Sequence, residues 1–507
     1  MQQLKRLSEK EVSDGSLIFC YAGSSGFRHF CFKEKREPMK KPVFIILILL
    51  ISNLVSGQER SSYRYENDFI PSDFYKGCRS ELRTQMPDSS IAIFFSSPVR
   101  NRSNDTDYPF HQHPQFYYLT GFTEANSLLL IFKSPFSIAG KSTDEILFIP
   151  PRVKEREIWH GRMAAIDDAK NITGIQTVFF SPAFDTISLH ATDFSKVLYL
   201  PLPSGIVDDR RDSSDLYDQV EIFKSKFSYP PSNGDSYLLS KILKRMREVK
   251  KPVEINLLEK AITISCEGHR EMMKALKPGM SEYQVQAVGE YVFKNKGAED
   301  VGYPSICGGG ENSCILHYET NRKPLKEGEL LLLDMAAEYH GYSADVTRTL
   351  PVNGTFSNEQ KIIYQLVLKA QDSAFSQCKP GNNFQDPHHA AAEIIKKGLL
   401  NLGIIKEEED YKTYFMHGTS HYLGLDVHDA GTGNKLSKGN VITVEPGIYI
   451  PVNSNCDPKW WNIGVRIEDD VLITANGYEN LSGSCPSKVE DIEKLMQVAP
   501  SFVVPLK

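Results

Sequence analysis

Four carboxylates and one imidazole lie inside or directly beside short apolar segments in the last third of this chain. They are Asp334, Asp345, His421, Glu445 and Glu468. Burying four negative charges together costs a large amount of free energy unless cations balance them. Two divalent ions would do so. This group constrains the fold more than any other feature, because a compact structure must either gather the five side chains around cations or leave each one in water.

The first two acids flank a turn signal. The apolar run 329–336 contains Asp334, the strand pattern 343–349 contains Asp345, and Tyr339-His340-Gly341 lies between them. We predict a hairpin folded about Tyr339-His340, in which Asp334 and Asp345 face each other. Directly opposed residues have Cβ atoms about 4.5–5.5 Å apart, so the carboxylates would repel unless they share a metal or a proton. The alternative is a pair of solvated acids at a sheet edge.

Two later strand patterns each deliver an acid. The strand pattern 441–444 is followed by Glu445, just before a Pro-Gly break. Residues 462–473 predict one continuous strand, in which alternation places Arg466 and Glu468 on one face and Asp469 on the other. An acid in the middle of such a run is costly to bury unless it is paired or coordinated. We therefore expect Glu468 in a site, and Asp469 with Asp470 on a solvated face and strand end.

Three histidines, His417, His421 and His428, lie within twelve residues and are interleaved with glycines. The spacing of the first two resembles the helical zinc-binding pair of metalloproteases. No Glu follows His417, however, and Gly418 disfavours a helix, so that motif is excluded. The crowding favours side chains that line a cavity over three unrelated core or surface histidines.

Six motifs then occur in order: ILHY (315–318), LDMA (333–336), SADVTRT (343–349), MHGTSHYLGLDVHD (416–429), VEPGIY (444–449) and VRIED (465–469). Together they resemble aminopeptidase P, the Xaa-Pro aminopeptidases of the pita-bread metallopeptidases, over roughly residues 60–480. The resemblance implies an α/β N-terminal domain followed by an α+β pita-bread catalytic domain. It also implies hydrolysis of the bond between an N-terminal residue and a following proline.

The same resemblance implies two divalent metal ions held by Asp334, Asp345, His421, Glu445 and Glu468, with Asp345 and Glu468 bridging. A carboxylate-rich set with one imidazole suits Mn²⁺, Co²⁺, Fe²⁺ or Zn²⁺, and we expect Mn²⁺. Two such ions can share a water and acidify it.

Further roles are implied for residues around these ligands. Glu445 would carry a proton from the water to the leaving nitrogen. His428 or His317 would donate a hydrogen bond to the developing oxyanion. His417 and Arg466 would edge a pocket for the proline ring, and Tyr449 occupies the position of the family's active-site tyrosine.

Other functions remain open at this point. A prolidase, which cleaves only Xaa-Pro dipeptides, shares the fold and the ligands, although the wording Ser420-His421-Tyr422 favours aminopeptidase P. A methionine aminopeptidase is disfavoured by the long N-terminal region. A metal-free binding protein on the same fold would be marked by lost ligands, and all five are present.

Length and composition predict two folded domains. The chain has 507 residues, 41% hydrophobic and 24% charged, which is too long for one ordinary core. Strand patterns alternate with helical stretches over 60–240 and predict an α/β domain. A linker at 247–252 interrupts the helical region 241–276, so we place the catalytic domain at 245–507. The net charge of −6 offers no general attraction to nucleic acid, and we expect no such partner.

The N-terminal segment 1–57 reads as a leader. Met39-Lys40-Lys41-Pro42 precedes a nine-residue apolar run, 43–51, and small residues follow up to Gly57. That order is typical of a secretory signal peptide, and the run is too short to span a bilayer comfortably. We predict that residues 39–57 are the signal, that 1–38 are an over-extended gene model, and that the protein is exported to the periplasm or secreted, without stable membrane insertion. A signal-anchored protein is the alternative.

Cysteines and assembly complete the predictions. Seven cysteines follow the leader at irregular spacing, which is not a disulfide framework, and Cys307–Cys314 or Cys456–Cys485 are the pairs to test. We expect a homodimer or a homotetramer. The segment 157–162 resembles a family signature in which the residue corresponding to Trp159 reaches a neighbouring subunit; a packed aromatic side chain is the alternative.

Overall fold

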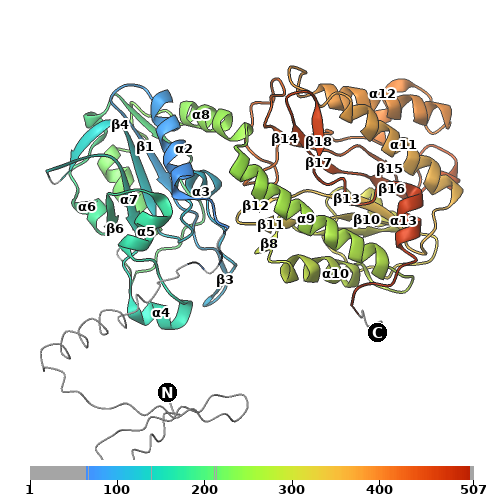
Figure 1. Cartoon of the computed structure of the whole chain (residues 1–507), viewed down its shortest axis with the longest axis horizontal. Coiled ribbons are helices and arrows are strands. Elements are labelled where there is room, and N and C mark those ends of the chain that lie inside the picture. Colours follow the sequence, from blue (N-terminus) through green and yellow to red (C-terminus); the bar gives the residue numbers. More distant parts are fainter. Residues whose placement is uncertain are drawn as a thin grey trace, which may run out of the picture. The chain divides into compact units, whose positions relative to one another are not determined.

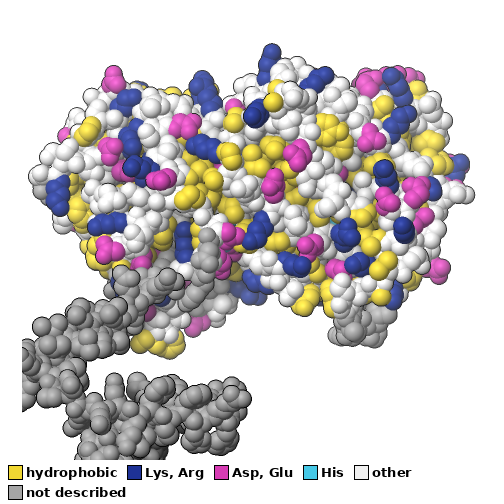
Figure 2. Space-filling model, in the orientation of Figure 1, with side chains coloured by type: hydrophobic (Ala, Val, Ile, Leu, Met, Phe, Trp, Pro, Cys, Tyr) yellow, Lys and Arg dark blue, Asp and Glu magenta, His cyan; other side chains and the backbone are white. Residues whose placement is uncertain are grey.

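The computed structural model describes residues 64, 66, 68–138, 140–210, 212 and 214–502. The leader predicted at 1–57 lies outside the described residues. The described residues from 66 onward form one compact unit. Among the described residues, none of the helices combines the length and the apolar composition that crossing a membrane requires. On the face drawn in Figure 2, positive and negative side chains are interspersed rather than gathered by sign.

The N-terminal half is built on a five-stranded sheet with strand order β6-β5-β4-β1-β7. The central strands are buried along their whole apolar runs, as expected for a sheet with helices packed against it (Figure 1). The β1–β4 and β4–β5 pairs are antiparallel, whereas β1–β7 and β5–β6 are parallel. The α/β prediction is therefore correct for this half, with a mixed sheet.

The elements of this half have the following bounds: α2 Ser72–Gln85, β1 Ser90–Phe95, β2 Asn101–Ser103, β3 Thr106–Asp107, α3 Pro114–Thr120, β4 Leu128–Ile138, β5 Lys141–Ile149, α4 Lys154–His160, α5 Ile166–Thr173, β6 Val178–Phe180, α6 Ala183–Thr186, η1 Ala191–Asp193, β7 Lys196–Tyr199 and α7 Leu216–Phe227.

A short break in the helical region falls within the predicted linker 247–252. Three residues separate helix α8 (Ser236–Glu248) from α9 (Pro252–Ala275). Pro252 suits the first position of α9, since the backbone N–H that proline lacks has no partner there in any helix. The Glu254 side chain accepts a hydrogen bond from the Lys251 backbone N–H, which completes the cap.

The C-terminal half pairs helices over short, curved strands. Helix α9 packs on α10, and α11 packs on α12, while the strands lie between these two helix pairs in Figure 1. The strands form three three-stranded sheets, β13-β10-β9, β12-β11-β8 and β14-β17-β18, and the pair β15-β16. Contacts of β16 with β13 and β10 join these pieces. This is the α+β arrangement that the motifs implied.

The elements of this half are α10 Glu282–Asn295, β8 Asp300–Val301, β9 Ile306–Gly309, η2 Gly310–Cys314, β10 Leu330–Asp334, β11 Ala337–Tyr339, β12 Tyr342–Ser343, β13 Thr347–Pro351, α11 Asn358–Phe375, α12 Asp386–Asn401, η3 Glu408–Thr413, β14 Val441–Val444, β15 Gly447–Ile450, η4 Pro458–Trp460, β16 Ile463–Arg466, β17 Asp469–Ile473, β18 Tyr478–Asn480 and α13 Val489–Leu495.

The predicted hairpin register is wrong by two residues. Tyr339 pairs with Tyr342, so the turn is centred on His340-Gly341 and not on Tyr339-His340. Both turn residues have positive φ, +48° and +79°, as a two-residue hairpin turn with the strand's own twist requires. Asp334 consequently faces Thr347 across the β10–β13 pair. A shift of two positions keeps both acids on the same face, so they still approach each other.

Two other expectations also need correction. The continuous strand at 462–473 is broken, since β16 ends at Arg466 and β17 starts at Asp469. Asp469 and Asp470 are fully buried, not solvated. All seven described cysteines are free, so neither of the two pairs singled out from the sequence is bridged.

Candidate metal centre

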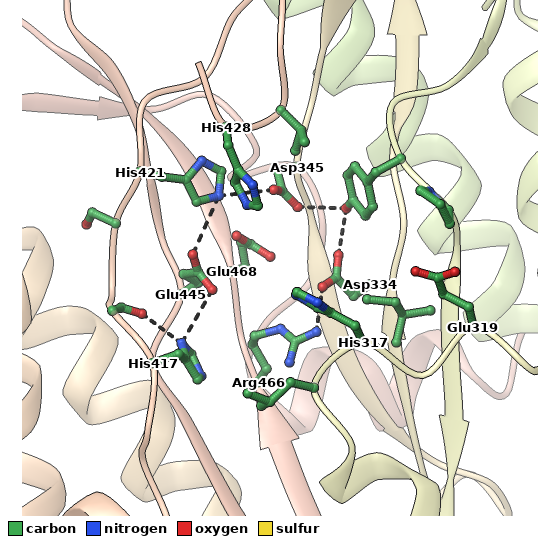
Figure 3. A pocket seen from close by; sticks show the side chains of 17 residues that line it. His317, Glu319, Asp334, Asp345, His417, His421, His428, Glu445, Arg466 and Glu468 are labelled. Carbon is green, nitrogen blue, oxygen red and sulfur yellow. Dashed lines mark hydrogen bonds and ion pairs between the residues drawn. The ribbon is translucent and has the colours of Figure 1, made fainter. Parts of the chain in front are cut away.

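The five predicted ligands open onto a single cavity in the C-terminal half. The cavity has a volume of about 390 Å³, and Figure 3 shows the side chains of His421, Asp345, Glu468, Glu445 and Asp334 around its centre. All five residues predicted to act beside the ligands belong to the same neighbourhood. His317, His417, His428 and Arg466 line the cavity, and Tyr449 is hydrogen-bonded to two of them.

Local chain geometry explains why these five side chains are free to converge. Asp334 is the last residue of β10, and Asp345 lies in the short non-strand segment between β12 and β13. Glu445 directly follows β14 and precedes Pro446, which cannot donate a backbone hydrogen bond to continue the ladder. Glu468 occupies the break between β16 and β17. Each ligand therefore sits at an interruption, where the backbone can aim a side chain across the sheet.

The tightest part of the group is Asp345, His421 and Glu468. One possible ligand atom from each lies within 4.8 Å of the other two. The His421 Nε2 atom is 3.3 Å from Asp345 Oδ2 and 3.5 Å from Glu445 Oε1. His421 also contacts the Tyr422 carbonyl through Nδ1, at 3.1 Å, which orients Nε2 toward the carboxylates. The segment around His417 and His421 is not helical, as predicted.

Asp334 joins the group through Tyr303, which the sequence did not single out. The Tyr303 hydroxyl is 2.6 Å from Asp334 Oδ1 and 2.6 Å from Asp345 Oδ1. One hydroxyl carries one proton, so it satisfies one of the two carboxylates at a time. The second oxygen of Asp334 accepts a charge-assisted hydrogen bond from Arg466. Tyr303 lies in the irregular segment between β8 and β9, with no pattern around it that marks a functional residue.

Electrostatics show that this group is short of positive charge. Burial raises the pKa of the Asp334, Glu445 and Glu468 carboxyls, and the neighbouring carboxylates add to the effect. Burial pulls the pKa of His421 down, but the carboxylates of Asp345 and Glu445 outweigh it and raise the pKa to about 9. The cluster thus captures protons in place of another cation. A divalent ion supplies the same charge without adding hydrogen atoms.

A hydrogen-bonded chain runs from the ligands to the far wall of the cavity. Arg466 Nη1 donates to the Tyr449 hydroxyl at 2.8 Å, and that hydroxyl is 2.8 Å from His417 Nε2. The His417 Nδ1 atom is 2.7 Å from the Gly418 carbonyl. A neutral His417 that donates from Nδ1 and accepts at Nε2 satisfies every contact. Burial lowers the pKa of His417 to about 3, with the Arg466 charge acting in the same direction, so the neutral form is the stable one.

His428 and His317 stand at the rim of the cavity and are exposed. The His428 ring meets the His421 ring edge-on, with centroids 4.5 Å apart. The next residue, Asp429, anchors the His428 loop, because it accepts from the Lys250 ammonium at 2.7 Å and pairs with Arg247. His317 approaches from the opposite side in Figure 3, where its ring lies beside Asp334 and Arg466.

Behind the cavity lies a buried polar scaffold. Asp469 accepts from the Arg348 guanidinium at 2.7 Å, and both side chains are almost fully inaccessible to water. Gln371 of α11 donates to Asp469 and to the backbone carbonyls of Val444 and Ile467. Val444 and Ile467, which carry these carbonyls, directly precede Glu445 and Glu468 in the chain. Asp469, which was expected to face solvent, therefore belongs to the buried network that holds the backbone next to Glu445 and Glu468.

Comparisons with known proteins agree with this geometry. Residues 75–199 match the model for the aminopeptidase P N-terminal domain, and residues 256–475 match metallopeptidase family M24. The Xaa-Pro aminopeptidase of Haemophilus influenzae is 35% identical over 439 residues, which cover 84% of this chain and 98% of that protein. The chain belongs to the aminopeptidase P family. It is therefore a metallo-exopeptidase of the M24 fold.

Solved structures of aminopeptidase P extend the match to three dimensions. The Pseudomonas aeruginosa aminopeptidase PepP has a TM-score of 0.76 and 35% identity, and the alignment covers 85% of this chain and 99% of that one. The Escherichia coli aminopeptidase P with the inhibitor Pro-Leu has a TM-score of 0.75 and 32% identity, covering 84% and 98%. An N-terminal domain followed by a pita-bread catalytic domain is thus the architecture of this aminopeptidase P family member.

Proposed function

We propose that this protein hydrolyses the peptide bond between an N-terminal residue and a following proline, using two divalent metal ions. The observation that carries the proposal is the convergence of Asp334, Asp345, His421, Glu445 and Glu468 on one cavity. The cavity opens to solvent and is rimmed by histidines, so a peptide terminus can enter it.

The positions of the side chains suggest which residues would hold each ion. The two oxygens of Asp345 face different partners: Oδ1 is turned toward Tyr303 and Asp334, and Oδ2 toward His421. A carboxylate in that position suits a bridging ligand. Asp334 would complete one ion's ligand set, and His421 with Glu445 the other, while Glu468 lies near enough to Asp345 and His421 to be shared.

The ions, when bound, would acidify a water and polarise the scissile carbonyl. The side chains around them would supply the proton transfers. Glu445 is partly exposed to the cavity, and its raised pKa makes it able to take a proton from water and pass it to the departing nitrogen. His428 and His317 stand where an N–H can reach the oxygen of the tetrahedral intermediate.

Selectivity for proline would rest on the wall formed by His417, Tyr449 and Arg466. The Xaa-Pro bond is a tertiary amide, so the substrate has no N–H to offer at that position. In a neutral His417, the Nδ1 proton is donated to the Gly418 carbonyl and the Nε2 atom accepts from the Tyr449 hydroxyl. The ring therefore needs no hydrogen bond from a substrate N–H. Its ring face is therefore available for contact with an apolar pyrrolidine ring.

The decisive experiment compares three substrates that differ in one feature each. The full-length protein is assayed with Gly-Pro-Leu, Gly-Ala-Leu and the dipeptide Gly-Pro under one defined metal. We expect release of free glycine from Gly-Pro-Leu and little from the other two. Turnover of Gly-Pro alone would instead show a prolidase, and equal rates on Gly-Pro-Leu and Gly-Ala-Leu would refute the proline pocket.

Metal identity and number need a separate measurement. We propose two Mn²⁺ ions, because the ligand set offers up to eight carboxylate oxygens and one nitrogen. Elemental analysis after dialysis against Mn²⁺, Co²⁺, Zn²⁺ or Fe²⁺, paired with activity, should give about two ions per chain. The variants Asp345→Asn and Glu468→Gln should lose both the ions and the activity, and one tightly bound ion in the wild type would contradict the dinuclear proposal.

We also propose that the chain assembles as a homodimer or homotetramer. Trp159 on α4 is 83% exposed and its neighbour Ile158 is 82% exposed, so this helix offers an apolar surface that another copy could cover. Light scattering of the wild type and of Trp159→Ala tests this, and a monomeric wild type would refute it.

Export after cleavage near Gly57 is likewise proposed, and N-terminal sequencing of the protein from its own cells tests it.

A further inference from the structure

Two cysteines that are far apart in the sequence meet at one backbone carbonyl. Cys266 lies in the middle of α9, and Cys485 lies in the loop before α13. The Cys266 sulfur is 3.6 Å from the Ser482 carbonyl oxygen, and the Cys485 backbone N–H donates to the same oxygen at 2.9 Å. The two thiols are in direct side-chain contact, and both residues are buried.

The other described cysteines that have sulfur contacts have other kinds of neighbour. Cys78 lies against the Lys251 ammonium, at 3.2 Å. Cys307 contacts the sulfur of Met335, and Cys378 donates to the Ala374 carbonyl in the last turn of α11. The proximity of Cys266 and Cys485 is therefore a specific feature of this fold and not the result of a cysteine-rich core.

The surroundings of Cys485 favour its thiolate, which is the reactive form of cysteine. The Arg348 guanidinium donates to the Cys485 carbonyl at 2.9 Å, so a fixed positive charge lies beside the pair. Burial would raise the pKa of Cys485, but the Cys266 thiol and the Arg348 charge outweigh it and hold the pKa below its ordinary value. Gly483 and Ser484, just before Cys485, are exposed, so a small reagent needs only a local movement of this loop to reach the sulfur.

We propose that Cys266 and Cys485 form a disulfide that ties helix α9 to the C-terminal loop behind the metal centre. The oxidant is a disulfide such as oxidised glutathione. The Cys485 thiolate attacks one glutathione sulfur and releases glutathione thiolate, and Cys266 then attacks the mixed disulfide and releases the second. Two protein thiols lose two electrons, one disulfide is reduced, and two glutathione thiols leave with the two protons.

The bond would act on the ligands through two short paths. Arg348 donates both to the Cys485 carbonyl and to the carbonyl of Glu468, at 2.6 Å. Asp470 accepts from the Asp345 backbone N–H at 3.1 Å, and its own backbone N–H donates to the hydroxyl of Ser482, the residue whose carbonyl the two cysteines share. Fixing the two sulfurs thus restrains the backbone on which Asp345 and Glu468 stand. The bond would also close a loop of more than two hundred residues, which reduces the entropy of the unfolded chain.

Peptide mapping of the full-length protein tests the proposal directly. The purified protein is equilibrated with glutathione buffers of increasing oxidised fraction, quenched with acid, alkylated and digested. We expect a linked Cys266–Cys485 peptide and a loss of two alkylatable thiols as the buffer becomes oxidising. If both thiols remain alkylatable in the most oxidising buffer, or if either sulfur is linked to a different cysteine, the proposal is wrong.

Thermal unfolding gives a second readout with a matched control. The melting temperature of the wild type should rise by about 3–6 °C on oxidation. Cys485→Ser should show no such rise, whereas Cys378→Ser, which removes a buried cysteine without a cysteine partner, should keep it. A rise of the same size in Cys485→Ser would overturn the proposal. The peptide map of the wild type decides the question even if the serine variants fold poorly.

Discussion

Replacing Asp469 by asparagine separates the support of the metal centre from the centre itself. Asp469 is the counter-charge of Arg348, whose guanidinium is fully buried and makes five hydrogen bonds, four of them to backbone carbonyls. Asparagine keeps the shape and one acceptor but removes the negative charge. The Arg348 cation then stays buried with no partner of opposite charge.

The cost follows from the burial of the pair. Removing one partner of a buried ion pair costs about 3–5 kcal/mol, far more than losing an exposed pair. Natural domains have only about 5–15 kcal/mol of total stability, so the variant should lose a large fraction of it. For a domain of the size of the catalytic half, this corresponds to a fall in melting temperature of very roughly 6–20 °C.

Urea unfolding and calorimetry of the metal-free protein measure this loss. Glu468→Gln serves as the contrast, because burial and the neighbouring carboxylates raise the pKa of that carboxyl, so removing its charge should leave the metal-free protein as stable as the wild type or more so. Asp88→Asn, at an exposed position, serves as the control for the substitution. The reasoning is refuted if Asp469→Asn unfolds within about 1 kcal/mol of the wild type, or if Glu468→Gln is the less stable of the two.

Three further outcomes are expected. Tyr303→Phe removes the hydroxyl that contacts Asp334 and Asp345, so metal affinity or kcat/KM should fall about 10–100-fold, and unchanged chelator competition would contradict this role. Burial of His269 lowers its pKa from 6.5 to about 4, so between these pH values the unfolded chain binds a proton at this residue and the folded chain does not. The free energy of unfolding should therefore fall by up to about 3 kcal/mol as the pH drops from 6.5 to 4. His269→Gln, which can keep the contact with the Met335 carbonyl, should flatten that slope, and an equal slope in both proteins would exclude His269 as its source. Gly341→Ala should cost about 1 kcal/mol from its positive φ of +79°, since the added Cβ meets nothing closer than 3.5 Å; a stability change near zero in urea unfolding would show that the turn relaxes.

Much of the site could be read from the sequence because its signals are local. Each ligand stands at the end of, or in a gap within, an apolar strand pattern, and an acid in such a place is costly unless something compensates it. The position of α9 after a short linker was readable for the same reason, since Pro252 marks a helix start. The motifs added the order and spacing that identify the family.

The hairpin shows where local reasoning loses accuracy. Alternation predicts which face Asp334 and Asp345 share, but it does not select between registers that differ by two residues. The turn decides between them, and here His340 adopts a positive φ that a non-glycine residue enters only at some cost. The predicted face of Asp334 and Asp345 is therefore correct, whereas the residue opposite Asp334 is Thr347 and not Asp345.

By itself the sequence determined the kinds of ligand, the face of each strand on which they lie and the family to which the chain belongs. The tertiary structure alone decided what covers the opposite face. The sequence pattern predicted a solvated Asp469, but Arg348 and Gln371 cover it and hydrogen-bond to it. No sequence motif marks Tyr303 as a functional residue. Cys485 lies beside Cys266 and not beside Cys456, the partner considered from the sequence. The physical reason is that periodicity records how a strand alternates, whereas burial and charge pairing depend on elements that are distant in the sequence.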